Sequence, residues 1–77
     1  MRFNYSKLLG RMKECGYTQE KMAQALDISN GTMSKKLNNK ASFYQPEMQK
    51  VCELLNIAGE ELYAIFFTPE VEKNSTK

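Results

Sequence analysis

The stretch from Tyr17 to Lys40 reads YTQEKMAQALDISNGTMSKKLNNK and contains the clearest structural signals in the chain. Thr18 and Ser29 each precede a run suited to a short helix, and a hydroxyl at that position can accept a hydrogen bond from an orphan backbone N–H. Only a three-residue turn separates the two runs, and a polar, basic loop follows the second. Two short capped helices joined in this way are typical of a helix-turn-helix, which we expect over residues 18–38.

The two runs differ in what they can bury. The first, Gln19 to Leu26, carries a small residue, Ala23, where a second helix must cross it closely. The second, Asn30 to Leu37, has a narrow apolar seam, and its remaining side chains are small, polar or basic. A helix with this surface suits the major groove of DNA, which is about 12 Å wide.

The rest of the chain predicts three more helices, over residues 5–15, 46–55 and 59–67. Apolar residues recur in each at the spacing of a helix that buries one face. They are Tyr5, Leu8, Leu9, Met12 and Cys15, then Met48, Val51, Cys52 and Leu55, then Leu62, Ile65 and Phe66. Asn4 is expected to cap the first of these helices and Gly16 to end it. We therefore expect an all-α, compact five-helix domain over residues 1–67 and a flexible polar tail over residues 68–77.

The composition excludes several classes of protein. With 77 residues, 42% apolar and 26% charged, the chain fits one globular domain. It has no histidine, and its two cysteines, Cys15 and Cys52, form no CxxC pair, so we expect reduced core thiols, no metal site, no cofactor and no enzyme. No stretch is long and apolar enough to span a membrane, and the first residues lack the apolar run of a secretory signal, so we expect the protein in the cytoplasm.

The charge is distributed unevenly along the chain. Residues 1–50 carry nine basic and four acidic residues, a net +5, whereas residues 51–77 carry two basic and five acidic residues, a net −3. This asymmetry favours a polyanion bound to the first part, although a solvated surface with chance asymmetry would look the same.

Several short motifs occur in a fixed order along the chain. Thr18-Gln19, Ala23, the turn Leu26-Asp27-Ile28-Ser29 and Asn38-Asn39-Lys40 resemble the helix-turn-helix of the lambda-repressor-like (Xre/Cro) family. Tyr5-Ser6-Lys7-Leu8, Lys36-Leu37-Asn38 and Phe66-Phe67 extend the resemblance, over residues 1–67, to short phage and prophage repressor-like proteins. The resemblance implies a compact lambda-repressor-like DNA-binding domain of five helices.

Two departures from the family pattern concern the turn and the core. Asp27 replaces the usual turn glycine, which aspartate tolerates at some cost because it enters the left-handed region more readily than most residues. Met12 and Leu37 replace an Arg–Glu pair that some relatives carry, and the exchange of both partners leaves no charge unpaired.

The resemblance also implies roles for individual residues. The expected base-reading residues are Asn30, Gly31, Thr32, Ser34 and Lys35. The expected phosphate contacts are Thr18, Gln19, Lys36, Asn38, Asn39, Lys40, Ser42 and Tyr44. Asn can pair with adenine and Lys with guanine, whereas phosphate contacts give affinity and register. The alternative for both sets is an ordinary solvated polar surface.

The aromatic end of the chain suggests a second surface. Tyr63, Phe66 and Phe67 cannot all point inward from one short helix, so they are candidates for a homodimer contact; equally, they could close the monomer core. A dimer would place two recognition helices about 34 Å apart on a near-palindromic site.

These features favour a sequence-specific regulator of phage or prophage type that binds double-stranded operator DNA. The alternative is an antitoxin or anti-repressor that uses the same fold to bind a protein. If the protein bound another protein through residues 30–37, we would expect a hydrophobic outer face on that helix, which the sequence lacks. Nothing in the sequence indicates a small-molecule ligand.

Overall fold

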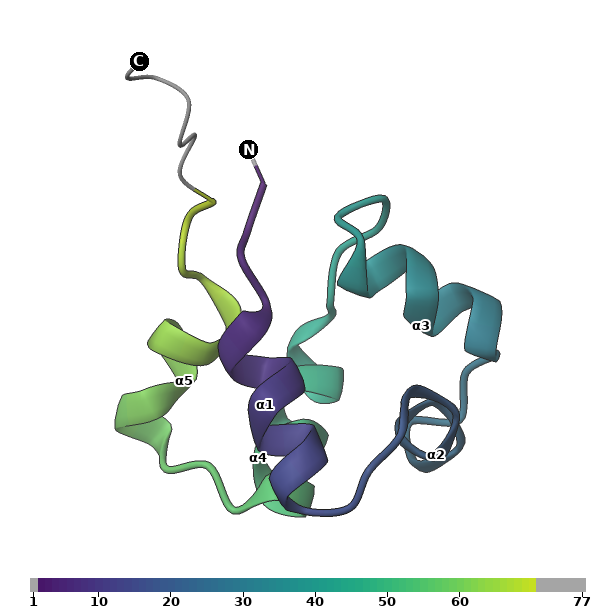
Figure 1. Ribbon diagram of the computed structural model, residues 1–77, viewed down its shortest axis with the longest axis horizontal. Helices are drawn as coiled ribbons and strands as arrows, with labels where there is room; N and C mark the ends of the chain where they lie inside the picture. The colour runs from purple at the N-terminus through teal and green to yellow at the C-terminus, as the bar shows by residue number, and fades with distance from the viewer. Residues whose placement is uncertain (1, 71–77) are drawn as a thin grey trace.

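The computed structural model describes residues 2–70 and contains five helices. They are α1 (Ser6–Glu14), α2 (Gln19–Ala25), α3 (Asn30–Leu37), α4 (Gln45–Leu55) and α5 (Gly59–Phe66). The expected all-α fold is confirmed, and each helix end lies within one residue of its predicted position. In Figure 1, α1 lies at the centre with α4 behind it, α5 lies on one side, and α2 and α3 lie on the other. None of the described helices is long and apolar enough to cross a membrane.

The helix ends follow from single residues. The Thr18 hydroxyl accepts a bond from Lys21 N–H (3.1 Å), and the Ser29 hydroxyl accepts one from Thr32 N–H (3.0 Å), so both predicted caps are confirmed. Gly16 ends α1 with a φ of +80°, a conformation that glycine adopts without steric cost. Asn4 is not the N-cap of α1 as predicted, because Tyr5 occupies that position. The Asn4 side chain lies one residue earlier and accepts a bond from Ser6 N–H (2.8 Å).

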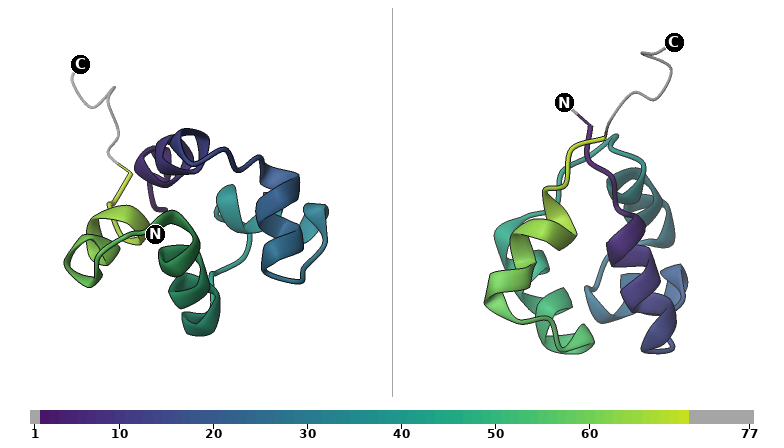
Figure 2. Two further views of the ribbon diagram at one scale, coloured as in Figure 1. Left: turned by 90° about the horizontal axis from the view of Figure 1, so that it is seen from below. Right: turned by 60° about the vertical axis from the view of Figure 1, so that its left-hand side comes forward.

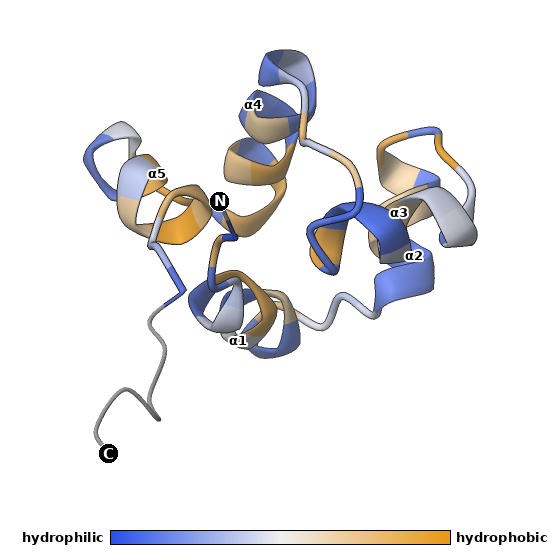
Figure 3. Cartoon of the chain, turned by 90° about the horizontal axis from the view of Figure 1, so that it is seen from above, coloured by the Kyte–Doolittle hydropathy of each residue, from blue (hydrophilic) through white to orange (hydrophobic). Residues whose placement is uncertain are grey.

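The core joins all five helices. Its fully buried side chains are Leu8, Met22, Met33, Val51, Leu55 and Phe66. Three rings, those of Tyr5, Phe43 and Phe66, form a chain of edge-to-face contacts with centroids 5.5 and 5.3 Å apart. In Figure 3 the second half of α5, which supplies Phe66, is coloured as hydrophobic.

The predicted apolar stripe of α1 is only partly right. Leu8 and Met12 are buried, but Leu9 is 46% exposed and Cys15 is exposed. Cys52 is half-buried, so the expectation of two core cysteines is wrong for Cys15. The predicted stripe is too wide, since residues 8 and 9 point about 100° apart and a short helix packed on one side buries only one of them.

We expect the two free thiols to react at different rates. Burial raises the pKa of the Cys52 thiol, and the nearby Glu61 carboxylate raises it further, so less thiolate is present and reagents reach it poorly. In the native protein, iodoacetamide should therefore label Cys15 well before Cys52, as peptide mass mapping over time would show. Equal labelling rates would contradict this, and labelling in denaturant provides the control.

The two ends of the described chain pair with each other. Asn4 N–H donates to Thr68 O (2.7 Å), Glu70 N–H donates to Arg2 O (3.0 Å), and the Arg2 and Glu70 side chains form an exposed ion pair (3.0 Å). Figure 2 shows the two segments side by side in its right-hand view. Residues 68–70 are thus held against residues 2–4, contrary to the expected start of a flexible tail at residue 68. Residues 71–77 of that predicted tail lie outside the described residues.

Candidate nucleic-acid interface

The turn between α2 and α3 is built around an aspartate in a left-handed conformation. Asp27 has a φ of 60°, and Ile28 N–H then donates to Ala23 O (3.0 Å). Ala23 is buried, as its predicted place at the crossing of two helices requires. Figure 1 shows α2 end-on while α3 runs across the view, so the two helices cross steeply.

One side-chain bond ties the starts of the two helices together. Gln19 Nε2 donates to Asn30 Oδ1 (2.9 Å), with a longer contact to Asn30 O (3.4 Å). The bond fixes the orientation of the Asn30 amide, whose Nδ2 stays free to donate and whose Oδ1 retains a second lone pair. Asn30 is therefore held with both functions of its amide available at the start of α3.

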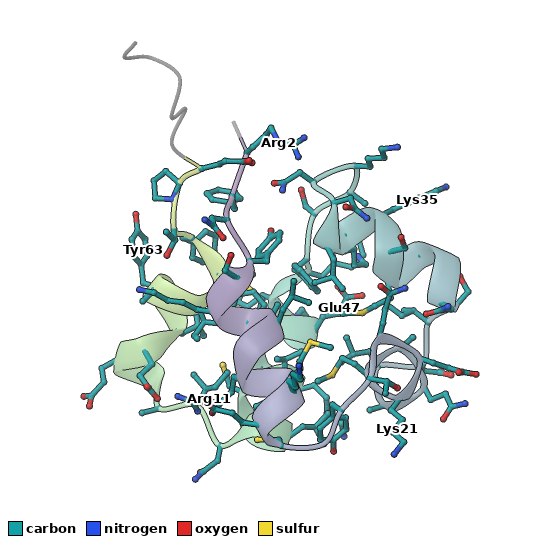
Figure 4. The ribbon with its side chains drawn as sticks, viewed as in Figure 1. Arg2, Arg11, Lys21, Lys35, Glu47 and Tyr63 are labelled. Carbon is teal, nitrogen blue, oxygen red and sulfur yellow. The ribbon has the colours of Figure 1, made fainter. Side chains whose placement is uncertain are left out.

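The outer face of α3 is polar and basic. Asn30, Gly31 and Lys35 are exposed, and Thr32 and Ser34 are half-buried. Figure 4 shows Lys35 pointing away from the body of the molecule. Met33 is buried and Leu37 packs against the core, so the inner face is as narrow as predicted. All five predicted base-reading residues thus lie on one helix and outside the core, and four of them carry polar side chains.

Two of these residues make local hydrogen bonds. The Thr32 hydroxyl accepts from the Ser29 hydroxyl (2.9 Å), and the Ser34 hydroxyl accepts from Asn38 Nδ2 (3.3 Å). In both bonds the hydroxyl acts as acceptor, which leaves its hydrogen free to donate to a base or a phosphate.

Most of the predicted phosphate residues surround the two ends of α3. Thr18, Asn38, Lys40, Ser42 and Tyr44 are exposed, and Gln19 is half-buried. Lys40 N–H donates to Lys35 O (2.8 Å), which turns the chain sharply after α3 and keeps the Lys40 side chain near that helix. The two ends of α3 are therefore flanked by exposed donors.

Asn39 faces inward rather than outward. Its Oδ1 accepts from Phe3 N–H (2.8 Å), and its Nδ2 donates to Phe3 O (2.9 Å). These two bonds turn its amide toward the N-terminal segment, and its φ of 64° is part of the turn. Its predicted role as a phosphate contact is replaced by that of a clamp on the N-terminal segment.

Lys36 is the clearest correction to the predicted site. Its side chain is 3% exposed, and its Nζ lies 3.0 Å from Glu47 Oε1 and donates to Ser42 O (2.8 Å). A lysine buried in this way cannot reach a phosphate. The burial of Lys36 could have been predicted from the sequence. Lys36 follows the buried Met33 by three residues and therefore lies on the same face of the helix.

A second basic residue, Arg11, acts within the fold. Its Nη1 donates to Leu55 O (3.2 Å) and to Asn56 O (3.4 Å) at the end of α4, and its Nη2 pairs with Glu61 Oε2 (2.9 Å) in α5. Figure 4 shows it on the side of α1 away from α3. Arg11 thus joins three helices and contributes no charge to the face around α3.

The contacts of Glu61 predict a dependence of stability on pH. Its carboxylate accepts from Ala58 N–H, which lowers its pKa most, and Arg11 lowers it further, against a rise from burial. A carboxyl pKa lowered by folding stabilises the native state above the unfolded pKa, and this contribution is lost as the pH falls through the folded pKa. The free energy of unfolding should therefore decrease below about pH 4.5, the ordinary value for this group. Urea unfolding from pH 3 to pH 7 (roughly the carboxyl titration range) would measure it.

Glu61→Gln should flatten this acid dependence, whereas Glu60→Gln, a change at the exposed neighbouring residue, should leave it intact. An equal loss of the acid dependence in both variants would mean that the contacts of the Glu61 carboxylate with Ala58 N–H and Arg11 are not responsible.

No group of histidine, cysteine, aspartate or glutamate side chains within residues 2–70 is arranged to hold a metal ion. The exposed side chains on and after α3 offer amides, hydroxyls and two ammonium groups, those of Lys35 and Lys40.

A family model described as "Protein of unknown function (DUF739)" matches residues 1–69. The chain belongs to this family. Members of DUF739 are thus expected to share the five-helix arrangement, since the match covers every helix. No curated protein sequence matched the chain.

A solved structure extends this assignment. The DUF739 chain is similar to the modulator of repression (MOR) of the temperate bacteriophage TP901-1 from Lactococcus lactis, whose solution structure superposes with a TM-score of 0.73. The two sequences are 34% identical over 87% of this chain and 90% of that chain. The DUF739 chain is thus related over nearly its whole length to a small phage regulatory protein.

Proposed function

We propose that the protein is a sequence-specific, double-stranded-DNA-binding regulator of phage or prophage transcription, acting in the cytoplasm of the bacterial host. In this proposal α2, the turn and α3 form a helix-turn-helix, and α3 is the recognition helix in the major groove. The observation that carries the proposal is the outer face of α3. Amide, hydroxyl and ammonium groups are presented to solvent there, on a helix whose one buried apolar side chain is that of Met33.

Each group on that face has a partner in the major groove. Asn30 can pair with adenine through its Oδ1 and Nδ2, and Lys35 can donate to the guanine O6 and N7 acceptors. The Thr32 methyl can contact thymine, and Gly31 lets the helix backbone approach the bases closely. The bond from Gln19 supports this reading, because an amide held in one orientation discriminates between bases better than a free one.

The phosphate contacts of the proposal lie on both sides of α3. Thr18 and Gln19 would bond one backbone strand from the start of α2, where free N–H groups favour an anion. Asn38, Lys40 and the Ser42 and Tyr44 hydroxyls would bond the other. Such contacts set register and affinity without reading sequence.

A homodimer on DNA is part of the proposal, through Tyr63 and Phe67. Tyr63 is 72% exposed, and its ring lies 5.4 Å from that of the half-buried Phe67. Phe66 is 2% exposed in the core, so it drops out of the predicted contact. One small domain covers little DNA, and a second copy would extend the site.

The alternative function is that of an antitoxin or anti-repressor that uses the same fold to bind a protein, and the name of the relative, modulator of repression, is compatible with it. On this alternative, capture of a partner protein would be unaffected by changes at Asn30 and Lys35 on the α3 face.

Selection of bound sequences from a random duplex pool tests the proposal. The full chain should enrich one motif, and Asn30→Ala should lose it. Enrichment of no motif, with duplex binding absent at low salt, would reject DNA binding and leave protein binding as the function.

A further inference from the structure

The ion pair between Lys36 and Glu47 lies between α3 and the start of α4. Lys36 is 3% exposed and Glu47 13% exposed, and Lys36 Nζ also lies 4.2 Å from the centre of the Tyr44 ring. Lys36 Nζ thus has three neighbours, the Glu47 carboxylate, the Ser42 carbonyl and the Tyr44 ring. All three follow α3 in the sequence, in the loop after it or in the first turn of α4. In Figure 4, Glu47 lies in the interior, between α3 and the rest of the core.

Glu47 extends these contacts to the start of α4. The same oxygen, Oε1, that pairs with Lys36 also accepts from Tyr44 N–H (2.9 Å). One carboxylate oxygen therefore holds both the recognition helix and the first residue before α4. The return segment, which we define as residues 38–44, is fixed at its end by Glu47 and near its middle by the bond from Lys36 to Ser42 O.

Stability alone does not account for two charges at this place. Removing a carboxylate and an ammonium from water is costly, and a pair of apolar residues of similar size often makes a protein equally stable or more stable. Met33 and Val51 show that this core accepts apolar residues. A buried ion pair with directional hydrogen bonds restricts the segment that it holds to one geometry, whereas apolar packing would tolerate several.

We propose that the Lys36–Glu47 pair is a positioning device that fixes the return segment relative to α3, and that it thereby determines how well the protein discriminates its operator from other DNA. This inference rests on the proposed function, since it concerns the same DNA surface. Asn38, Lys40, Ser42 and Tyr44 lie on the return segment, and phosphate contacts from it set the register in which Asn30 and Lys35 meet the bases. Lys36 acts through these residues and does not touch DNA.

The test uses the double variant Lys36→Met/Glu47→Gln in the full chain. Lys36→Met alone would leave a poorly hydrated carboxylate without its partner and destabilise the protein, whereas the double variant buries no charge. The glutamine introduced in place of Glu47 retains an amide oxygen that can accept from Tyr44 N–H. The ratio of affinities for the selected duplex and a scrambled duplex should decrease at least about tenfold, with an unfolding free energy close to that of the wild type.

The salt dependence separates this role from a phosphate contact. A lysine that neutralises a phosphate contributes about 0.9 to the slope of log K against log salt concentration. The double variant should keep the wild-type slope. Lys40→Ala should reduce the magnitude of the slope by about 0.9, the value of one phosphate contact, and should weaken binding to both duplexes equally. An unchanged discrimination ratio, or a slope reduced by about 0.9 in the double variant, would overturn the inference.

Amide hydrogen exchange tests the pair independently of DNA. The Lys40 and Ala41 amides, which donate to Lys35 O, should exchange at least about tenfold faster in the double variant. The Ile28 amide, in the turn before α3, is the control and should not change. If wild-type protein binds no duplex, the proposed function fails, but unchanged exchange at Lys40 and Ala41 is what would refute positioning by the pair.

Discussion

Replacing Phe66 with alanine is expected to leave the chain largely unfolded at room temperature. Phe66 is 2% exposed and contacts the Phe43 ring edge-to-face at 5.3 Å, in a core that every helix shares. Such a truncation costs about 3–5 kcal/mol, and a domain of this size has roughly 3–5 kcal/mol of stability in total. Far-ultraviolet circular dichroism with urea titration would measure the loss.

Tyr63→Ala is the matched control, on the same helix but 72% exposed. It should change the unfolding free energy by less than about 0.5 kcal/mol. A folded Phe66→Ala variant with near wild-type stability would mean that the aromatic cluster does not hold the fold together.

Lys35→Ala is expected to abolish most of the preference for the operator over other duplexes. Lys35 is exposed, points away from the body of the molecule and lies among the proposed base contacts (Figure 4). A contact of this kind is worth about 1–3 kcal/mol of discrimination, so affinity for the selected duplex should decrease tenfold or more, at about 1.4 kcal/mol per factor of ten. Competition titrations with selected and scrambled duplexes would measure this difference.

Lys50→Ala removes the same charge from an exposed position in α4 and is the control for Lys35→Ala. It should leave the preference unchanged. If both variants reduce binding to every duplex equally, Lys35 contributes only charge, and the proposed base contact is wrong.

The sequence predicted most of the fold because the signals there are local. Thr18, Ser29 and Gly16 set helix ends through bonds or backbone angles within a few residues of themselves. The turn between α2 and α3 could be predicted equally well, since aspartate at position 27 is one of the few residue types that enter the left-handed region readily. Phe43 and Ile57, both buried, were missed because they lie between helices, where no periodicity marks them.

The errors at the candidate site arise from contacts between residues distant in sequence. Asn39 is bound to Phe3, thirty-six positions away, and Lys36 to Glu47 in the next helix. The sequence alone does not distinguish a basic or amide side chain that faces solvent from one that binds a distant part of the chain. The exposed residues of α3, in contrast, followed directly from the narrow apolar seam of Met33 and Leu37.

Binding of duplex DNA by α3 and its flanking residues can be measured by titrating the wild-type chain with the selected duplex at several salt concentrations. We expect an affinity that decreases steeply and linearly on a log–log scale as salt increases, with tighter binding to the selected than to the scrambled duplex. Absence of binding to either duplex at low salt would mean that α3 is not a DNA-recognition helix.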